Sequence, residues 1–464
     1  MSLRETLGGG GFAPQMPVKP VMPVVSLMQP QPPLSPVATD AYKLLKERMH
    51  LKLLDKFDLN MLETLSPTVL RKEISAMVER LLGEDHSHIN ELEQRSLIRD
   101  IQYEMLGFGP LELLMVDPTV SDILVNSYQQ IYVERKGRLE LTNVTFTDEK
   151  HLLRIINKIV SLVGRRIDES SPMVDARLPD GSRVNAVIPP IALDGPMMSI
   201  RRFAHIPLKM HNLTSGDFKS LTTDMALMLE GLAKAKVNMI ISGGTGAGKT
   251  TLLNILSGYI PVTERVVTIE DAAELQMQQP HVVRMETRPP NTEGTGEVSQ
   301  RALVRNALRM RPDRIVIGEV RGAEAVDMLQ AMNTGHEGSL TTIHANTPRD
   351  ALSRLENMIG MANLNLPHRA ARQQIASAIT VVIQGLRLID GKRKITSIQE
   401  ITGMEGEVIT MQEIFAFKQT GVGTSGEVEG YFHATGVRPK FMDRLHAFGV
   451  RLSDDMFDPT RQYQ

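Results

Sequence analysis

A glycine-rich run that ends in lysine and threonine is the clearest sign of chemistry in this chain. Residues 243–250 read GGTGAGKT, in which Gly243, Gly248, Lys249 and Thr250 fit the pattern G-x-x-x-x-G-K-T. The run follows VNMII, a β-prone apolar stretch, and leads into TTLLNILSGYI, which has the periodicity of an amphipathic helix. A turn in this context aims its backbone N–H groups and the helix N-terminus at phosphate oxygens. We therefore predict a nucleotide site, in preference to a turn that only caps a helix.

This loop would supply most of the groups that hold a nucleotide and its metal ion. Lys249 would neutralise the β- and γ-phosphates of ATP, and the Thr250 hydroxyl would bind Mg²⁺. The glycines would let the backbone approach the phosphates closely. The predicted nucleotide-binding residues of the loop are Gly243, Gly244, Thr245, Gly246, Ala247, Gly248, Lys249, Thr250 and Thr251.

Two acidic residues at the ends of other β-prone runs are candidates for activating water. RVVTIED ends in Glu270 and Asp271, and RIVIGEV contains Glu319. Carboxylates at the C-terminal ends of parallel strands lie on the face where α/β sheets bind ligands. We predict that Glu270 is the main water-positioning acid and that Glu319 acts on water, or on Mg²⁺ through water. Gly318 stands where an aspartate usually completes the magnesium shell, and surface acids that begin loops are the alternative for each glutamate.

Two histidines lie in the stretch GHEGSLTTIHANTP. His344 would follow a strand, where it could hydrogen-bond the γ-phosphate, and His336 is either a nucleotide contact or a packing residue. A zinc site is disfavoured because the spacing is not H-E-x-x-H and the chain has no cysteine.

Arginines form two further candidate groups. Arg301, Arg305 and Arg309 fall at i, i+4 and i+8 of a predicted helix, where like charges repel unless an anion or an acidic surface compensates. A solvated face and a subunit or nucleotide contact both remain open for them. Arg201 and Arg202, in SIRR, precede a predicted linker and are better placed to reach a neighbouring site as an arginine finger.

Composition limits the possible partners. The 464 residues carry 52 Lys plus Arg against 54 Asp plus Glu, so no global basic charge attracts nucleic acid or an anionic membrane. With no cysteine, disulfides and thiol catalysis are excluded. The apolar stretch IASAITVVIQGL is shorter than the roughly 18 residues that a spanning helix needs, and the N-terminus has no continuous apolar region typical of a signal peptide. We expect a cytoplasmic protein that reaches membranes only through partners.

The chain divides into four predicted parts. Prolines recur every third residue near the start, which is typical of an extended tail that forms no core. Helical patterns follow, then short strands around one helix, and then strands that alternate with helices around the phosphate motif, as in a parallel sheet with crossover helices. The predicted boundaries are a Pro-rich arm at 1–40, a three-helix bundle at 41–107, an α+β domain at 108–212 and an α/β domain at 213–464.

With these residues placed, the chain resembles the ATPase superfamily of type II secretion, type IV pilus and type IV secretion motors. It is most similar to the CpaF/TadA family, which powers tight-adherence (Tad, Flp-type) pili. The resemblance runs from about residue 41 to the end. It rests on the segments DPTVSDILVN, SSPMVDARLPDGSRVNAVIPP, ISGGTGAGKTTLLN, TIEDAAELQ, RIVIGEVRG, GHEGSLTTIHAN and GMEGEVITMQEIF.

The resemblance implies a fold and a role for each motif. The fold would be a RecA-like P-loop ATPase domain preceded by a small PAS-like α+β domain and a helical bundle. Residues 243–250 correspond to the Walker A box, Glu270 to the acid of the Asp box and Glu319 to the end of an atypical Walker B box. His336 and His344 belong to the His box.

The resemblance also implies how the amino-terminal domain takes part. Arg183, in DGSR, together with Arg201 and Arg202, corresponds to residues with which family members reach the nucleotide from that domain. The four-cysteine zinc module of type II relatives is impossible in this chain, which favours the Tad assignment.

Implied partners are five further copies of the chain, in a homohexamer, and an inner-membrane platform protein through which ATP hydrolysis assembles the pilus, with retraction left open. One alternative is a type IV secretion-like ATPase that moves DNA or protein effectors. Direct nucleic-acid contact is not expected, because the net charge is −2, tryptophan is absent and aromatic residues make up only 4% of the chain. A nucleotide-gated scaffold with negligible turnover is the other alternative.

Overall fold

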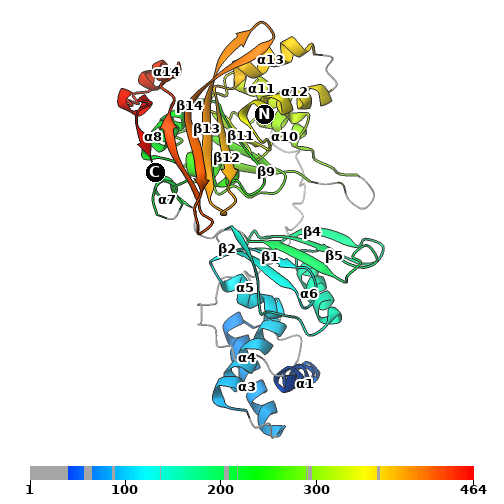
Figure 1. Cartoon of the computed structure of the whole chain (residues 1–464). Coiled ribbons are helices and arrows are strands. Elements are labelled where there is room, and N and C mark those ends of the chain that lie inside the picture. The colour runs from blue at the N-terminus through cyan, green and yellow to red at the C-terminus, as the bar shows by residue number, and fades with distance from the viewer. Residues whose placement is uncertain are drawn as a thin grey trace, which may run out of the picture. The chain divides into compact units, whose positions relative to one another are not determined.

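The computed structural model describes residues 40–463 apart from 57–64, 86–88, 136, 203–207, 217, 289, 291–294 and 363–365 (Figure 1). The predicted Pro-rich arm lies outside the described residues, except for its last residue. Chain contacts define two units. The first contains residues up to Val133 and Leu141–Arg202, and the second contains Glu134–Glu140 and the chain from residue 203 onward.

Three helices begin the first unit, namely α1 (Asp40–Lys56), α3 (Pro67–Glu84) and α4 (Glu91–Leu106). A capping box between Asn90 and Glu93 starts α4, because each side chain accepts a hydrogen bond from the other's backbone N–H. The three helices share one apolar core. Its fully buried members are Met49, Leu53, Ile74, Val78, Leu97 and Ile101.

A six-stranded sheet follows, built mostly from residues of the first unit, with strand order β3-β2-β1-β6-β5-β4. Helix α6 (Glu149–Leu162) lays its apolar side against this sheet, and together they enclose a second core. The strands are β1 (Val120–Val125), β2 (Ile131–Arg135), β3 (Arg138–Leu141), β4 (Met173–Arg177), β5 (Arg183–Val187) and β6 (Met197–Arg201), and the short helices η1 (Gly109–Leu111) and α5 (Glu112–Val116) precede them.

The second unit is built on a ten-stranded sheet of order β16-β15-β14-β13-β12-β7-β11-β10-β8-β9. Its strands are β7 (Met239–Gly243), β8 (Val266–Glu270), β9 (Val282–Glu286), β10 (Arg314–Ile317), β11 (Leu340–Ile343), β12 (Val381–Arg387), β13 (Arg393–Glu405), β14 (Val408–Val422), β15 (Val428–Ala434) and β16 (Gln462–Tyr463). Neighbouring strands from β12 to β9 are parallel, as the sequence predicts. Those from β12 to β16 are antiparallel, an extension that the sequence does not predict.

Helices cover both faces of this sheet. Along β7, the side chains of Met239 and Ile241 enter one core, and Ile240 enters the other. The first core includes α8 (Thr223–Lys234), α9 (Lys249–Ser257) and α14 (Met442–Ala447), and the second includes α10 (Gln300–Ala307), α11 (Glu324–Asn333), α12 (Pro348–Met361) and α13 (His368–Ala378). A strand buried on both faces is mainly apolar, which explains the run Met239–Ile241 at the start of β7. The short helices α7 (Met210–Thr214) and η2 (Asp454–Phe457) complete the unit.

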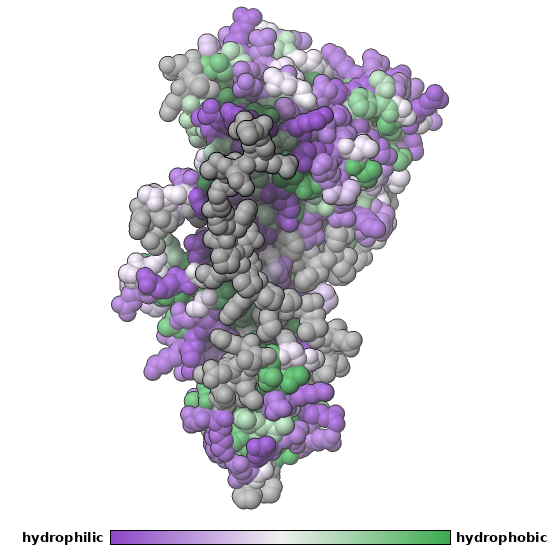
Figure 2. Space-filling model, turned by 180° about the vertical axis from the view of Figure 1, so that it is seen from behind, coloured by the Kyte–Doolittle hydropathy of each residue, from purple (hydrophilic) through white to green (hydrophobic). Residues whose placement is uncertain are grey.

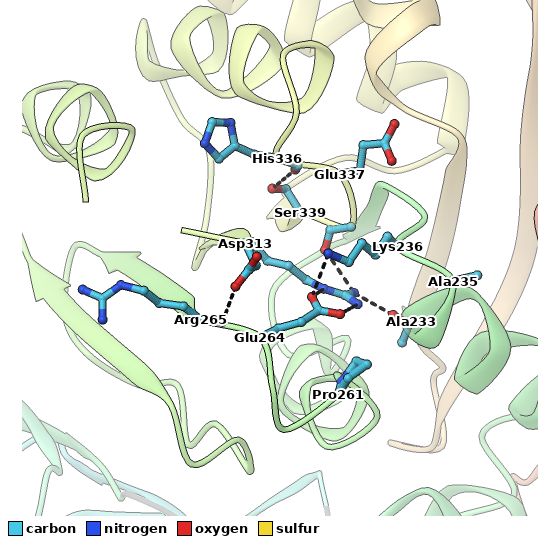
Figure 3. A network of polar contacts seen from close by, with 12 residues as sticks. Ala233, Ala235, Lys236, Pro261, Glu264, Arg265, Asp313, His336, Glu337 and Ser339 are labelled. Carbon is cyan, nitrogen blue, oxygen red and sulfur yellow. Dashed lines mark hydrogen bonds and ion pairs between the residues drawn. The ribbon is translucent and has the colours of Figure 1, made fainter. Parts of the chain in front are cut away.

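A buried ion pair joins the strands at the edge of the sheet where β8 and β10 begin (Figure 3). Arg314 is fully buried, and its guanidinium donates to both oxygens of Glu264 at 2.6 and 3.1 Å and to the Ala233 carbonyl at 2.6 Å. Gly338, with a φ of +78°, passes so close that a Cβ there would lie 2.8 Å from Arg314 Nη1. This network links α8, the starts of β8 and β10, and the turn that precedes β11.

Several large apolar side chains are exposed in the described part of the chain, among them Leu193 and Ile389. Figure 2 shows hydrophilic residues over much of the visible surface, with apolar ones scattered among them. Within the described ranges, no helix is both long and apolar enough to span a bilayer.

Candidate nucleotide site

The loop between β7 and α9 has the backbone that its glycines predict. Gly246 and Gly248 have φ values of +73° and +88°, in the left-handed region that favours glycine. Gly243 lies beside Gly385 of β12, and a Cβ at Gly243 would be 2.5 Å from the Gly385 carbonyl oxygen. The predicted strand, turn and helix are confirmed.

Lys249 points back over this loop. Its ammonium donates to the carbonyl oxygens of Gly243 and Gly244 at 2.9 and 3.0 Å, and lies 3.3 Å from His344 Nε2. Burial lowers the pKa of Lys249, and the nearby Glu319 carboxylate opposes that shift. An ammonium held by neutral carbonyls would form stronger, charge-assisted bonds with phosphate oxygens.

Thr250 and Thr251 occupy the first turn of α9, and both are half-buried. No cluster of three or more His, Asp or Glu side chains suited to a metal exists among the described residues. A magnesium ion that keeps most of its waters needs only one or two protein ligands in addition to nucleotide phosphates. The hydroxyl of Thr250 fits that requirement.

Glu270 ends β8 and is almost fully buried, with 3% of its surface exposed. One of its carboxylate oxygens accepts from the N–H groups of Glu274 and Leu275 at 2.6 and 2.7 Å. The other oxygen is buried without a hydrogen-bond partner in the part of the chain that the structure describes. Burial raises the pKa of Glu270, although the two backbone hydrogen bonds partly offset the rise. The second oxygen is therefore an unused proton acceptor.

Gly318 packs against this acid, which gives a physical reason for the missing aspartate. A Cβ at Gly318 would lie 3.1 Å from Glu270 Cγ. An aspartate at this position would press against the Glu270 side chain.

Glu319 and His344 meet at the ends of β10 and β11. Glu319 Oε1 lies 3.1 Å from His344 Nε2, and Glu319 Oε2 accepts from Arg321 at 2.7 Å. Burial lowers the pKa of His344, Lys249 lowers it further and Glu319 opposes both effects. A continuous line of polar contacts thus runs from Lys249 through His344 and Glu319 to Arg321.

Arg321 is a site residue that the sequence analysis did not single out. Its guanidinium links Glu319 to Asp271, whose carboxylate lies 3.3 Å away, and so joins the loops that follow β8 and β10. The spacing in GEVRG, with a cation two residues after the acid, is the sequence signal for it.

His336 lies at the other end of β11 from His344. It precedes the strand, its carbonyl oxygen accepts from Ser339 Oγ at 2.7 Å, and it belongs to the surroundings of the Glu264 network (Figure 3). Its Nδ1 is buried and has no partner among the described residues. Because the strand separates them at roughly 3.3 Å per residue, the structure does not bring His336 to the loop of its own chain.

The arginines of the first unit lie on neighbouring strands of its sheet. Arg183 and Arg201 pair across β5 and β6. Arg201 forms an ion pair with Asp122 at 3.1 Å, and Arg202 donates to the Val120 carbonyl at 2.9 Å. That they reach a nucleotide remains a prediction.

Arg301 and Arg305 of α10 lie beside an acidic side chain, whereas Arg309, predicted on the same helix, lies in the turn after α10 ends at Ala307. Arg301 Nε donates to Asp327 of α11 at 2.7 Å, and Arg305 Nε lies 3.8 Å from the same carboxylate. Asp327 therefore compensates two of the three like charges, and Arg309 donates instead to the Arg305 carbonyl.

Comparison with known proteins decides the family. The family model described as "Type II/IV secretion system protein" matches residues 104–424, more than half of the chain. The chain belongs to the type II/IV secretion system protein family. The resemblance to that superfamily is thus confirmed, at a level coarser than CpaF/TadA.

Named relatives of this type II/IV secretion system protein include a "Putative conjugal transfer protein" of Mycobacterium tuberculosis, 37% identical over 69% of this chain and 92% of the relative. Another is "Conjugal transfer protein TrbB" of Rhizobium radiobacter, 31% identical over 67% of this chain and 91% of the relative. Among solved structures, the VirB11 ATPase from the Brucella suis type IV secretion system is 27% identical over 62% of this chain and 94% of that chain, with a TM-score of 0.34.

Proposed function

We propose that this secretion-family protein is an ATPase that drives the assembly of a Tad (Flp-type) pilus. The observation that best supports the ATPase activity is the line of contacts from Lys249 of the glycine loop through His344 to Glu319, together with the unpartnered carboxylate oxygen of Glu270 on another strand of the same sheet. A protein that only binds nucleotide needs the loop alone, whereas hydrolysis also needs groups that orient water and accept its proton.

Each residue then has a proposed role. The loop amides and Lys249 bind the phosphates, and Thr250 would help hold Mg²⁺, which when bound offsets phosphate charge. Glu270, with one oxygen fixed by two backbone N–H groups, keeps the other for the proton of the attacking water. Neutral His344 lies beside Lys249, where it can donate to the terminal phosphate and register its loss.

The mechanical work would be done by a homohexamer. We propose that hydrolysis moves the amino-terminal domain against the motor domain, with Arg183, Arg201 and Arg202 reaching the nucleotide. The ring would act on inner-membrane platform proteins from the cytoplasmic side and would attach to the membrane only through them. The Tad assignment itself rests on the sequence resemblance.

Substitution of single residues tests the activity. Lys249→Ala and Glu270→Ala are each expected to abolish ATP turnover while the far-UV circular dichroism spectrum and the melting temperature stay close to wild type. A folded Lys249→Ala protein with normal turnover would exclude this site. A wild-type protein that binds ATP with no turnover above the Lys249→Ala blank would instead identify a nucleotide-gated scaffold.

A second candidate function is movement of DNA or protein effectors through a secretion channel. The specific observation in its favour is that relatives at 31–37% identity carry conjugal-transfer names. The two candidates differ in their response to DNA. Salt-sensitive DNA binding, or an ATPase rate raised by DNA, would support the second, whereas an unchanged rate together with loss of surface pili in a deletion strain would support the first.

A further inference from the structure

The segment between β8 and β9 forms neither helix nor strand, so its backbone N–H groups need other partners. Residues 271–281 connect Glu270, the last residue of β8, to Val282, the first of β9. An N–H group that is shielded from water and lacks an acceptor is costly, so the acceptors help to fix the segment. Between residues 274 and 278, four N–H groups donate to side chains.

The first two of these N–H groups hold the candidate acid. Those of Glu274 and Leu275 donate to the same carboxylate oxygen of Glu270, at 2.6 and 2.7 Å. Burial raises the pKa of Glu270, and these two bonds oppose the rise because they stabilise the ionised carboxylate. Among nearby charges, Arg284 lowers this pKa and the Glu274 carboxylate raises it. The segment therefore affects both where the acid lies and how readily it accepts a proton.

The other two N–H groups are held by α9, the helix that begins at the glycine loop. That of Gln276 donates to Asn254 Oδ1 at 2.9 Å, and that of Gln278 donates to Ser257 Oγ at 3.2 Å. Because an N–H group needs an acceptor, the amide oxygen of Asn254 faces the segment, and its nitrogen does not. Ser257 is fully buried, and its hydroxyl donates in turn to the Asn254 carbonyl at 2.6 Å. Helix α9 thus supports the segment at two points.

Apolar packing adds to these hydrogen bonds. Leu275 is 1% exposed and belongs to the same core as Leu252, Leu253 and Leu256 of α9. Its backbone N–H donates to Glu270 while its side chain is buried in that core. Helix, segment and acid are therefore connected through adjacent residues of one short stretch of chain.

We propose that Asn254 is a positioning residue for Glu270. It fixes Gln276, the residue that follows the two N–H groups holding the acid. Asn254 lies at i+4 from Thr250 on α9, so the helix that carries the proposed magnesium ligand also supports the acid. The inference rests on the proposed function, because it acts through Glu270 as the base that activates water. Asn254 itself touches no reacting atom.

Hydrogen exchange of the full-length protein tests the support itself. Asn254→Leu replaces the amide by an apolar group of similar size, so the Gln276 N–H loses its acceptor. We expect amide exchange in a peptide covering residues 274–278 to become about tenfold faster in this variant. Asn254→Asp keeps an acceptor oxygen at the same place and should restore slow exchange. Exchange at the wild-type rate in Asn254→Leu would overturn the proposal.

Steady-state kinetics tests the effect on Glu270. Asn254→Leu should lower kcat for ATP about tenfold and leave KM within about twofold of wild type, because a displaced base affects the chemical step more than binding. Weaker bonds to the carboxylate should also raise the pKa of Glu270, so its component on the acid side of the kcat profile should move to higher pH. Asn254→Asp should restore most of kcat at the pH of highest activity. A lower kcat with an unmoved acid side would assign Asn254 a structural role only and overturn the proposal.

Ser257→Ala is the matched control. It removes a hydrogen bond between the same helix and the same segment, but at Gln278, farther from the N–H groups that hold Glu270. Its kcat should stay within about twofold of wild type. Equal losses of kcat in Ser257→Ala and Asn254→Leu would overturn the specific role of Asn254. Should Asn254→Leu fail to fold, Asn254→Ala removes the same acceptor without adding apolar volume and takes its place.

Failure of this inference can be told from failure of the proposed function. If Lys249→Ala and Glu270→Ala each abolish turnover while folded Asn254→Leu matches wild type, only the role of Asn254 is refuted. A folded wild-type protein with no turnover above the Lys249→Ala blank would refute both.

Discussion

His344 is the histidine of the candidate site whose charge should change as the pH falls below neutrality. Its Nε2 faces the Lys249 ammonium at 3.3 Å and the Glu319 carboxylate at 3.1 Å. Burial and Lys249 hold its pKa below the ordinary value of 6.5, so the ring is neutral at pH 7. As the pH falls through that lowered pKa, the ring gains a proton, repels Lys249 and pairs more tightly with Glu319.

We therefore expect kcat/KM for ATP to fall on the acid side, with a component from His344 at a midpoint below 6.5. Glu270 contributes in the same direction, because its pKa is raised from 4.5 and its proton-accepting form is lost on acidification. His344→Gln should remove the His344 component and leave that of Glu270. A pH profile of the variant that parallels wild type would show that His344 does not titrate in the mechanism.

Gly318 offers a test of how accurately Glu270 must be placed. A methyl group at this position would lie 3.1 Å from Glu270 Cγ, so Gly318→Ala should displace the acid by a few tenths of an ångström. We expect kcat to fall roughly tenfold with little change in KM, because misplacement of a catalytic group affects the chemical step more than binding. Gly360→Ala is the control, since a Cβ there meets no atom within 4 Å. Equal kcat values for Gly318→Ala and wild type would exclude Glu270 as the positioned base.

At the scale of elements, the starts of β8 and β10 depend on the pair between Glu264 and Arg314. Removing the charge of Glu264 would leave a fully buried guanidinium without its counter-ion. We expect Glu264→Gln to lower the free energy of unfolding of the second unit by about 3–5 kcal/mol.

Glu337→Gln, which breaks an exposed pair with Arg444 in the same region, should cost at most about 1 kcal/mol. Chemical denaturation of both variants measures the difference. Similar unfolding free energies for the two would mean that the buried pair is not needed to hold the strands together.

The secondary-structure elements also show which parts of the fold and of the candidate site can be predicted from the sequence. The strand, glycine loop and helix at 239–257 follow from local pattern, because each is specified by residues adjacent in sequence. Strand order depends on residues far apart in sequence. The strands of the antiparallel extension carry no local sequence signal that identifies their pairing partners. His336 and His344 lie in one motif, and the sequence left open whether His336 contacts the nucleotide or packs; the short strand β11 between them places them at its opposite ends. Arg321 joins Glu319 to Asp271 through contacts that only folding creates.

At the scale of the whole molecule, the central expectation is that catalysis needs neighbouring subunits. The ATPase rate per subunit should rise steeply with protein concentration, against Lys249→Ala as the blank, because dilution separates the subunits of a ring. Molecular mass measured on the same samples distinguishes a monomer with a complete site from a ring too tight to dissociate. A concentration-independent rate from a protein of monomeric mass would contradict the ring.

The amino-terminal arginines belong to the same scale. Arg201→Ala combined with Arg202→Ala should spare ATP binding and lower kcat by about 10³-fold or more, as loss of an arginine finger does. Arg201 and Arg202 also contact Asp122 and the Val120 carbonyl, so thermal unfolding must be measured alongside. Equal losses of binding and turnover would assign the two residues to the structure of the first unit.

The place of β7 in the sheet has a consequence for biosynthesis. Its neighbour β12 lies about 140 residues later in the chain, so Gly385 must be synthesised before it can pair with Gly243. At the usual 5–20 residues per second, the ribosome needs roughly 7–30 s to add that stretch. During this time β7, the strand that leads into the glycine loop, lacks its partner on that side. The proposed nucleotide affinity should therefore appear only late in translation, and β7 is the strand that a chaperone would be expected to protect until then.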